Sequence, residues 1–232
     1  MSGAAPSPDL ERFVGEMPTE RRPILDLMRE AAAAQPAGAR VLDAGAGTAP
    51  YRELFAHCDY ATADWEASMH EGARTADIVA SLDALPVPDA SFDAVLNTQV
   101  LEHVTDPVKV ASELHRVLVP GGRLWLTAPL LWPLHEEPYD FWRFTSHGLR
   151  QVLEQAGFRV ERLEPRGGYF SALATVLAGA PYWTGPAPRR EPLRRALALA
   201  LHGVAPLVRR LDALDGQRSL TLGYACVASR PE

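Results

Sequence analysis

The chain has 232 residues, a formal net charge of −6 and a hydrophobic share of 47%. This length suits one α/β domain with an insertion, and the negative charge argues against broad electrostatic capture of nucleic acid. The two cysteines are too few for a disulfide framework, and no CxxC pair suggests a metal site. The start of the chain lacks the basic and apolar regions of a signal peptide, and no apolar run is long enough to span a bilayer. The expected compartment is a reducing, bacterial cytoplasm.

Residues 1–18 are expected to form a loose arm, and the elements after them alternate between helix and strand. The predicted helices are 20–35, 50–57, 107–118 and 145–155, with Ser146 as a cap of the last. The predicted strands are 40–44, 60–64, 77–81, 92–97, 123–128, 158–164 and 220–229, with a turn at 120–122. Such alternation predicts an α/β fold in which helices cover both faces of a parallel sheet.

The segment 165–219 does not fit this alternation. It contains two apolar helical stretches, 169–180 and 193–214, separated by a stretch rich in proline and arginine. We therefore predict a single domain, 1–232, that carries an inserted helical pair at 165–219.

The strongest motif is the stretch VLDAGAGT at 41–48, where a buried strand leads into a glycine-rich turn. Glycines allow a sharp turn and a close approach of the backbone to a ligand, which then meets free N–H groups. The third glycine of the dinucleotide pattern GxGxxG is absent, so this motif alone is weak evidence for a nucleotide site.

Polar residues follow the next predicted strands in order. Asp64 ends the second strand, Asp83 follows the third, and Asn97 ends the fourth. Open α/β sheets bind ligands at the carboxyl ends of their strands. Each residue alone could be a helix cap or a solvated loop residue, but together they indicate a ligand site at this edge.

Four stretches carry a resemblance to a known family: VLDAGAGT at 41–48, LPVPDASFDAV at 85–95, VLEHV at 100–104, and ELHRVLVPGGRLWLTAP at 113–129. Together they resemble class I S-adenosylmethionine-dependent methyltransferases of the type 11 group. The resemblance implies a three-layer, Rossmann-like sheet of seven strands in the order 3-2-1-4-5-7-6, with the last strand antiparallel.

The resemblance also implies S-adenosylmethionine as cofactor, with S-adenosylhomocysteine as product, and assigns residues to it. Asp43, Gly45 and Gly47 would hold the methionine part, and Asp64 would hold the ribose. Trp65 would lie against the adenine, whose edge would meet Asp83, Ala84 and the carbonyl of Asn97.

The acceptor site is expected over the loops after the fourth and fifth strands. The loop 129–145 combines aromatic and ionisable residues, a content typical of binding sites. His135 is the candidate general base, with Asp140 to orient it and Tyr139 or Glu102 as other bases. The alternative is that His135 and Asp140 only pin the loop together. The candidate substrate-binding residues are Gln99, Trp132, Trp142 and Arg143, although Arg143 could instead pair with Asp140 or Glu137.

The loop pattern resembles bacterial methyltransferases of glycan or natural-product pathways, which implies a small-molecule acceptor and favours O- or N-methylation. His103 is assigned a mainly structural role. No metal site is expected, because His135, Glu136 and Glu137 are adjacent and cannot readily converge on one ion.

Two other functions stay open: an NAD-dependent oxidoreductase, and a catalytically silent partner subunit with a methyltransferase fold. Nucleic acid is not expected as acceptor, because Asn97-Thr98-Gln99-Val100 replaces the Asn/Asp-Pro-Pro-Tyr tetrad typical of that use. We hypothesise that the insertion covers the acceptor pocket or forms a homodimer contact. A plain extension of the core and a peripheral contact with a membrane surface are its alternatives.

Overall fold

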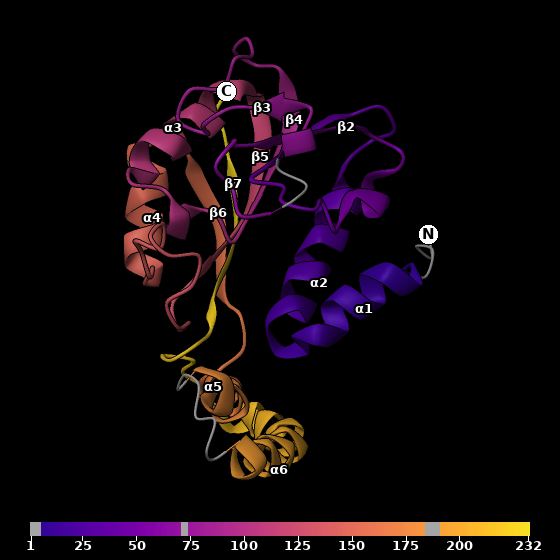
Figure 1. Ribbon diagram of the computed structural model, residues 1–232. Coiled ribbons are helices and arrows are strands. Elements are labelled where there is room, and N and C mark those ends of the chain that lie inside the picture. The colour runs from indigo at the N-terminus through magenta and orange to yellow at the C-terminus, as the bar shows by residue number, and fades with distance from the viewer. Residues whose placement is uncertain (1–5, 71–73, 184–190) are drawn as a thin grey trace.

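A mixed β-sheet forms the centre of the protein in the computed structural model, which describes residues 6–70, 74–183 and 191–232 (Figure 1). The strands are β1 (Arg40–Ala44), β2 (Asp59–Asp64), β3 (Ile78–Val79), β4 (Phe92–Thr98), β5 (Leu118–Pro129), β6 (Arg159–Pro165) and β7 (Gly223–Ser229). Their order across the sheet is β3-β2-β1-β4-β5-β7-β6, and β7 runs antiparallel to both of its neighbours. The predicted fold class and strand order are confirmed.

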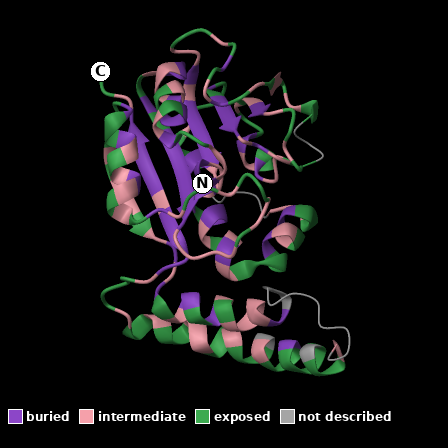
Figure 2. Ribbon diagram, turned by 60° about the vertical axis from the view of Figure 1, so that its left-hand side comes forward, coloured by how far each residue is buried: buried purple, intermediate pink, exposed green. Residues whose placement is uncertain are grey.

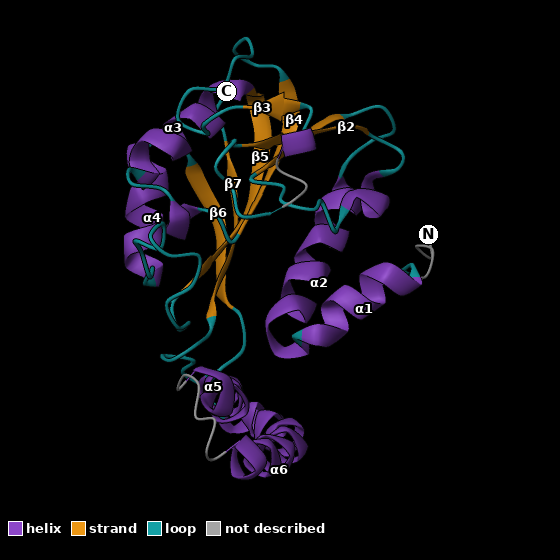
Figure 3. Ribbon diagram, in the orientation of Figure 1, coloured by secondary structure: helices purple, strands orange, loops and turns teal. Residues whose placement is uncertain are grey.

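Helices α1 (Pro8–Glu16) and α2 (Pro18–Ala34) cover one face of this sheet, and α3 (Pro107–Val117) and α4 (Ser146–Gln155) cover the other (Figures 1 and 3). Helices α5 (Tyr169–Trp183) and α6 (Glu191–Arg210) lie beyond the sheet. Short 3₁₀ turns are η1 (Arg52–Phe55), η3 (Leu101–His103) and η5 (Leu211–Leu214). Alternate strand residues serve the two faces: Leu42 and Val95 pack in the core beneath α3 and α4, whereas Val41 and Leu96 pack in the core beneath α1 and α2. Figure 2 shows the central strands buried between these layers.

The expectation of a loose N-terminal arm over 1–18 is wrong for residues 8–16, which form helix α1. Ser7 caps it by accepting a hydrogen bond from the Leu10 amide, and Pro8 occupies the first turn, where no N–H is needed. Leu10 and Val14 are buried in the core against α2. A helix this short is marginal on its own, so this packing decides its formation. Residues 1–5 of the expected arm lie outside the described residues.

Several predicted boundaries also differ from the structure. The expected turn at 120–122 lies inside β5, where Gly121 has a φ of +77° and the pairing with β4 shifts register nearby. The expected helix over 50–57 is only the 3₁₀ turn η1. The cap of α4 is Thr145, which accepts a hydrogen bond from Gly148 N at 3.1 Å, and Ser146 is the first residue of the helix.

The insertion is a helical pair, as predicted, and stands beyond the carboxyl end of β6 (Figures 1 and 2). Helices α5 and α6 lie side by side, and the Asp212 carboxylate accepts hydrogen bonds from Gly168 N and Ser171 N at the base of α5. Arg209 donates to the Thr19 hydroxyl of α2 at 2.9 Å, which joins the pair to the domain. The connector 184–190 lies outside the described residues. Apolar side chains including Leu193, Leu199, Leu207 and Leu214 are exposed on the pair.

Within the described chain, no helix combines the length and apolar character needed to cross a bilayer.

A buried ion pair joins the two ends of the domain. Arg166, directly after β6, donates to the Glu20 carboxylate of α2 at 2.6 Å, and the side chains of Arg166 and Glu20 are only 1% and 10% exposed. With its amide oriented to satisfy its neighbours, Gln99 donates to Glu20 and accepts from Arg166. A buried pair contributes little net stability while intact, but loss of one partner leaves an uncompensated buried charge.

We therefore expect Arg166→Met to lower the free energy of unfolding by about 3–5 kcal/mol. The control is Arg150→Met, which removes a solvent-exposed pair with Glu154 and should cost less than about 1 kcal/mol. Urea denaturation followed by circular dichroism measures both. Equal losses of unfolding free energy in the two variants would show that breaking the buried pair costs no more than breaking an exposed one.

Candidate functional site

The loop after β1 turns sharply because its glycines adopt a backbone conformation that other residues disfavour. Gly45 and Gly47 have φ values of +81° and +55°. The Gly45 amide donates to the Ala63 carbonyl of β2 at 2.8 Å, and the Gly47 amide donates to the Asp64 carboxylate at 2.7 Å. A Cβ atom on Gly45 would overlap the Val100 side chain. The loop is thus held tightly against the ends of both neighbouring strands.

Asp43 supports this loop from below. Its carboxylate is buried and accepts a hydrogen bond from the Tyr60 hydroxyl, and burial raises the pKa of Asp43 to about 6. Two cavities, described below, lie beside the glycine loop, and Asp43 lines neither of them. The structure therefore places it behind the site, where it holds the β1–β2 junction.

Two cavities meet at the carboxyl edge of the sheet. The first, here called the acidic cavity, has a volume of about 220 Å³ and is lined by residues that include Asp64, Trp65, Asp83, Asp106 and Phe141. The second, here called the histidine cavity, has a volume of about 240 Å³ and is lined by residues that include Gly47, His70, Gln99, Trp132 and His135. Both are lined by Gly45 and His103. An elongated ligand could therefore lie across the glycine loop with one end in each cavity.

In the acidic cavity, Asp64 is the central acceptor. It is 5% exposed, and its carboxylate accepts hydrogen bonds from Gly47 N and from Trp65 N at 2.8 Å. A carboxylate offers about four acceptor positions, so capacity remains for hydroxyl donors. Trp65 meets the Tyr139 ring edge-to-face, with centroids 4.9 Å apart, and Asp83 forms an ion pair with Lys109 at 2.9 Å.

Residues from five parts of the chain form the histidine cavity, and one of these parts is the glycine loop after β1. Gln99 follows β4, whereas Trp132, His135 and Glu136 follow β5. His70, from the loop after β2, reaches Glu136 at 3.2 Å, and the hydrogen bond with Glu136 raises the pKa of His70. The remaining wall comes from α1, α2 and the residue between them, with Phe13, Met17, Glu20, Arg21 and Ile24. The N-terminal segment thus closes a cavity that the sequence analysis assigned to the β4 and β5 loops alone.

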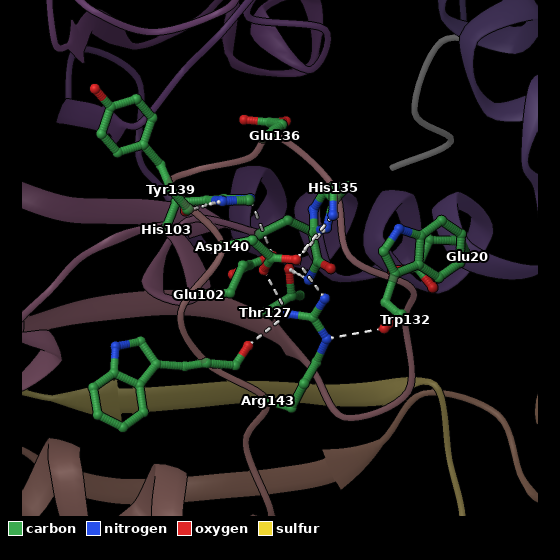
Figure 4. A network of polar contacts seen from close by, with 12 residues as sticks. Glu20, Glu102, His103, Thr127, Trp132, His135, Glu136, Tyr139, Asp140 and Arg143 are labelled. Atoms are coloured by element: carbon green, nitrogen blue, oxygen red, sulfur yellow. Dashed lines mark hydrogen bonds and ion pairs between the residues drawn. The ribbon is translucent and has the colours of Figure 1, made fainter. Parts of the chain in front are cut away.

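A polar network fixes the loop after β5 (Figure 4). The Asp140 carboxylate accepts two hydrogen bonds from Arg143, at 2.6 and 2.7 Å, and one from the His135 backbone at 2.9 Å. Burial alone would raise the pKa of Asp140, but the hydrogen bonds from Arg143 and His135 hold it well below its usual range. Arg143 also donates to the Trp132 and Pro133 carbonyls. Arg143 therefore pairs with Asp140, one of the two roles considered for it.

The other predicted site residues divide between the cavities and their supports. Gln99 and Trp132 line the histidine cavity, and Tyr139 lines the acidic cavity. Asn97 is fully buried and donates to the Ala44 carbonyl at 2.9 Å. Trp142 donates its indole N–H to the Val104 carbonyl at 2.8 Å. Of the predicted site residues, those that line neither cavity are Asp43, Ala84, Asn97, Asp140, Trp142 and Arg143.

His103, in the VLEHV stretch, lines both cavities, and Glu102 lies buried beside it. Glu102 is fully buried, and burial raises its pKa to about 8. His103 lies against it, with Nε2 3.9 Å from Glu102 Oε1, and its pKa is lowered by burial. Both residues stand in a motif recognisable from sequence, but their position between the cavities depends on the fold.

Residues 42–126 match a family model described as a methyltransferase domain. This segment is similar to methyltransferase domains. The chain is 36% identical over 143 residues to a Mycolicibacterium smegmatis protein named as a probable S-adenosylmethionine-dependent methyltransferase, with 54% of each chain covered. It is 34% identical over 126 residues to the ubiquinone/menaquinone biosynthesis C-methyltransferase UbiE of Pasteurella multocida, with 46% of this chain and 47% of that one covered. The chain thus spans about half the length of the curated relatives it matches.

A solved structure extends the likeness in fold to most of the chain. The crystal structure of the [4+2]-cyclase SpnF superposes with a TM-score of 0.57 at 23% identity, and covers 90% of this chain and 80% of that one. The matched segment 42–126 begins in β1 and ends within β5, so it includes the glycine loop, Asp64 and the VLEHV stretch. These are the parts of the methyltransferase domain that border both cavities.

We expect Gly45→Ala to abolish cofactor binding and to destabilise the domain, because the added methyl group meets Val100 as well as an unfavourable φ. The matched control is Gly38→Ala, which has a similar φ of +78° but open space around its Cβ position. The control should lose about 1–2 kcal/mol of unfolding free energy, and Gly45→Ala should lose about 1–3 kcal/mol more. Urea unfolding and isothermal titration with S-adenosylhomocysteine measure the two effects. Similar losses in both variants would contradict the close-approach argument.

Proposed function

We propose that this protein binds S-adenosylmethionine across the two cavities and transfers its methyl group to a small-molecule acceptor in the histidine cavity. The observation that carries the proposal is the position of the glycine loop at the junction of the cavities, with the Asp64 carboxylate fixed at its edge. The match to the methyltransferase-domain model supports it.

The proposed binding mode follows the chemistry of the two cavities. The adenosine part occupies the acidic cavity, where Asp64 accepts hydrogen bonds from the ribose hydroxyls and Trp65 packs on the adenine. Asp83 faces the adenine edge, although its ion pair with Lys109 limits it to the remaining acceptor positions. The methionine part passes Gly45 and Gly47 toward the histidine cavity. An NAD-dependent oxidoreductase is not favoured, because the matched model and both matched relatives carry methyltransferase names.

Methyl transfer makes modest demands on the protein. S-adenosylmethionine supplies an electrophilic methyl group on a sulfonium, which is already a good leaving group. The protein must align the acceptor with that methyl group and exclude water. The walls from α1, α2, Trp132 and Gln99 surround the space where the acceptor would lie. His135 faces this space and, with Nδ1 directed at Asp140, is the candidate to receive the proton of an oxygen or nitrogen acceptor.

The likeness to UbiE favours a second candidate within the same activity: methylation of a carbon atom in an aromatic or quinol acceptor. Product analysis separates the candidates, since NMR of the methylated product assigns the new methyl group to oxygen, nitrogen or carbon. Binding of the cofactor without turnover on any acceptor of a broad panel would favour the silent-subunit alternative.

Isothermal titration should show one S-adenosylmethionine or S-adenosylhomocysteine site per chain. We expect Asp64→Ala to weaken binding by about 1.5–3 kcal/mol, because hydrogen bonds to a charged acceptor are lost. Asp59→Ala is the matched control, since Asp59 is exposed at the opposite end of β2 and should leave the affinity unchanged. Failure of the unmodified protein to bind either compound would refute the proposed function.

His135→Ala should lower methyl transfer by about 10²–10⁴-fold while barely changing cofactor affinity, because general-base help is worth about this much. Release of S-adenosylhomocysteine with a panel of hydroxylated, amino and quinol compounds measures turnover. His147→Ala, at an exposed position of α4, is the control. An unchanged rate in His135→Ala would assign His135 a structural role.

A further inference from the structure

The Glu102 side chain is fully buried between the two cavities, yet neither of its carboxylate oxygens has a hydrogen-bond partner. An ionised carboxylate in such a position is costly unless a positive charge compensates it. The two side-chain cations that act on Glu102 are Arg166 and Arg143, and they are committed to Glu20 and Asp140. The usual partners of a buried carboxylate are therefore engaged elsewhere.

Each of the two histidines beside Glu102 has one ring nitrogen, Nε2, for which the described part of the chain supplies no hydrogen-bond acceptor or donor; His103 Nε2 lies 3.9 Å from Glu102 Oε1. His103 Nδ1 lies 2.8 Å from the Tyr139 carbonyl oxygen, and His135 Nδ1 lies 3.2 Å from Asp140 Oδ2. A carbonyl and a carboxylate only accept hydrogen bonds, so in each ring Nδ1 carries the hydrogen. The lone pair is then on Nε2 in both. The rings meet edge-to-face, with centroids 4.7 Å apart.

These three side chains converge on one point (Figure 4). One ligand atom from each of Glu102, His103 and His135 lies within 4.8 Å of the other two, in the only such group found among the described residues. In a tetrahedral site with bonds of about 2.1 Å, ligand atoms lie about 3.4 Å apart. Shifts of about an ångström in side chains would thus bring them to binding distance of a shared ion.

We propose that Glu102, His103 and His135 bind a divalent transition-metal ion of the zinc class. Two imidazoles and one carboxylate suit zinc, cobalt or iron better than magnesium or calcium, which prefer oxygen ligands. The Tyr139 carbonyl and the Asp140 carboxylate hold the outer nitrogens of the two rings, an arrangement that orients metal-binding histidines and fixes their tautomers. The proposal departs from the sequence argument, which expected no metal site, because Glu102 and His103 come close to His135 only in the folded chain.

The ion would have open positions toward the histidine cavity, which both His103 and His135 line. This consequence rests on the proposed function: an acceptor oxygen or nitrogen bound to the ion would lose its proton more readily, as metal-bound water does, and the proton would pass to solvent water in the cavity. His135 would then act through the ion, because its lone pair would no longer be free to accept a proton.

The test uses the full chain after treatment with a chelator and dialysis, with no cofactor or acceptor present. Isothermal titration with Zn²⁺ should show one site per chain, and added Co²⁺ should give the visible d–d absorption of a low-symmetry site. His103→Ala, His135→Ala and Glu102→Gln should each weaken Zn²⁺ binding by at least about tenfold, as even the loss of an outer-sphere partner typically does. His147→Ala, at an exposed position, should bind Zn²⁺ like the unmodified protein.

Glu102→Gln protects the test against misfolding, because glutamine keeps the volume and cannot become charged. A fixed excess of Zn²⁺ should raise the melting temperature of the unmodified protein more than that of Glu102→Gln. Absence of Zn²⁺ binding, or binding that survives all three substitutions, would overturn the site. Titration with S-adenosylhomocysteine in the same preparation tests the proposed function separately, so either idea can fail alone.

Discussion

The hydrogen bond from the Gly47 amide to the Asp64 carboxylate joins the ends of two neighbouring strands. It can form only because Gly45 and Gly47 turn the backbone through positive φ values and let the loop approach Val100 and β2. Once it forms, the Asp64 carboxylate stands at the edge of the acidic cavity, and the loop from Gly45 to Thr48 lines the histidine cavity. Everything else at the carboxyl edge is arranged around this junction.

Polar groups beneath and beside the junction are held by partners inside the protein. Asp43 is held by Tyr60, Asn97 by the Ala44 carbonyl, and Asp140 by Arg143. Buried polar groups need such partners, and a satisfied network holds its members in one geometry. This explains why several residues with the chemistry of a binding site do not touch either cavity: they keep the loops in place. Glu102 is the exception, because its carboxylate has no protein partner although it is fully buried.

The N-terminal helices show a second dependence on packing. Helix α2 covers one face of the sheet, and its Glu20 meets Arg166, which directly follows β6. This contact sets α2 against the end of β6 and brings α1 to the rim of the histidine cavity. The acceptor side of the domain is therefore formed partly by residues that precede the first strand. The helical pair α5–α6 meets this same region through Arg209 and Thr19, but no described residue of the pair lines either cavity.

The sequence by itself determined the fold class and the position of the glycine loop. These depend on local signals: apolar runs of strand length, the residues at strand ends, and glycines in a turn. Asp64 could be placed at the ligand-binding edge for the same reason, since the carboxyl ends of parallel strands share an edge. The strand order and the place of Trp65 followed instead from the resemblance to a known family.

Only the tertiary structure decided which polar residues meet. Arg143 could pair with Asp140 or with a ligand, and the choice depends on a loop conformation that no local pattern encodes. Helix α1 forms because Leu10 and Val14 find a core, and Glu102 and His103 meet His135 because the loops after β4 and β5 fold over the same edge. Contacts between residues distant in sequence depend on the packing of the whole chain. The sequence therefore identifies candidate residues, and the fold determines which of them are in contact.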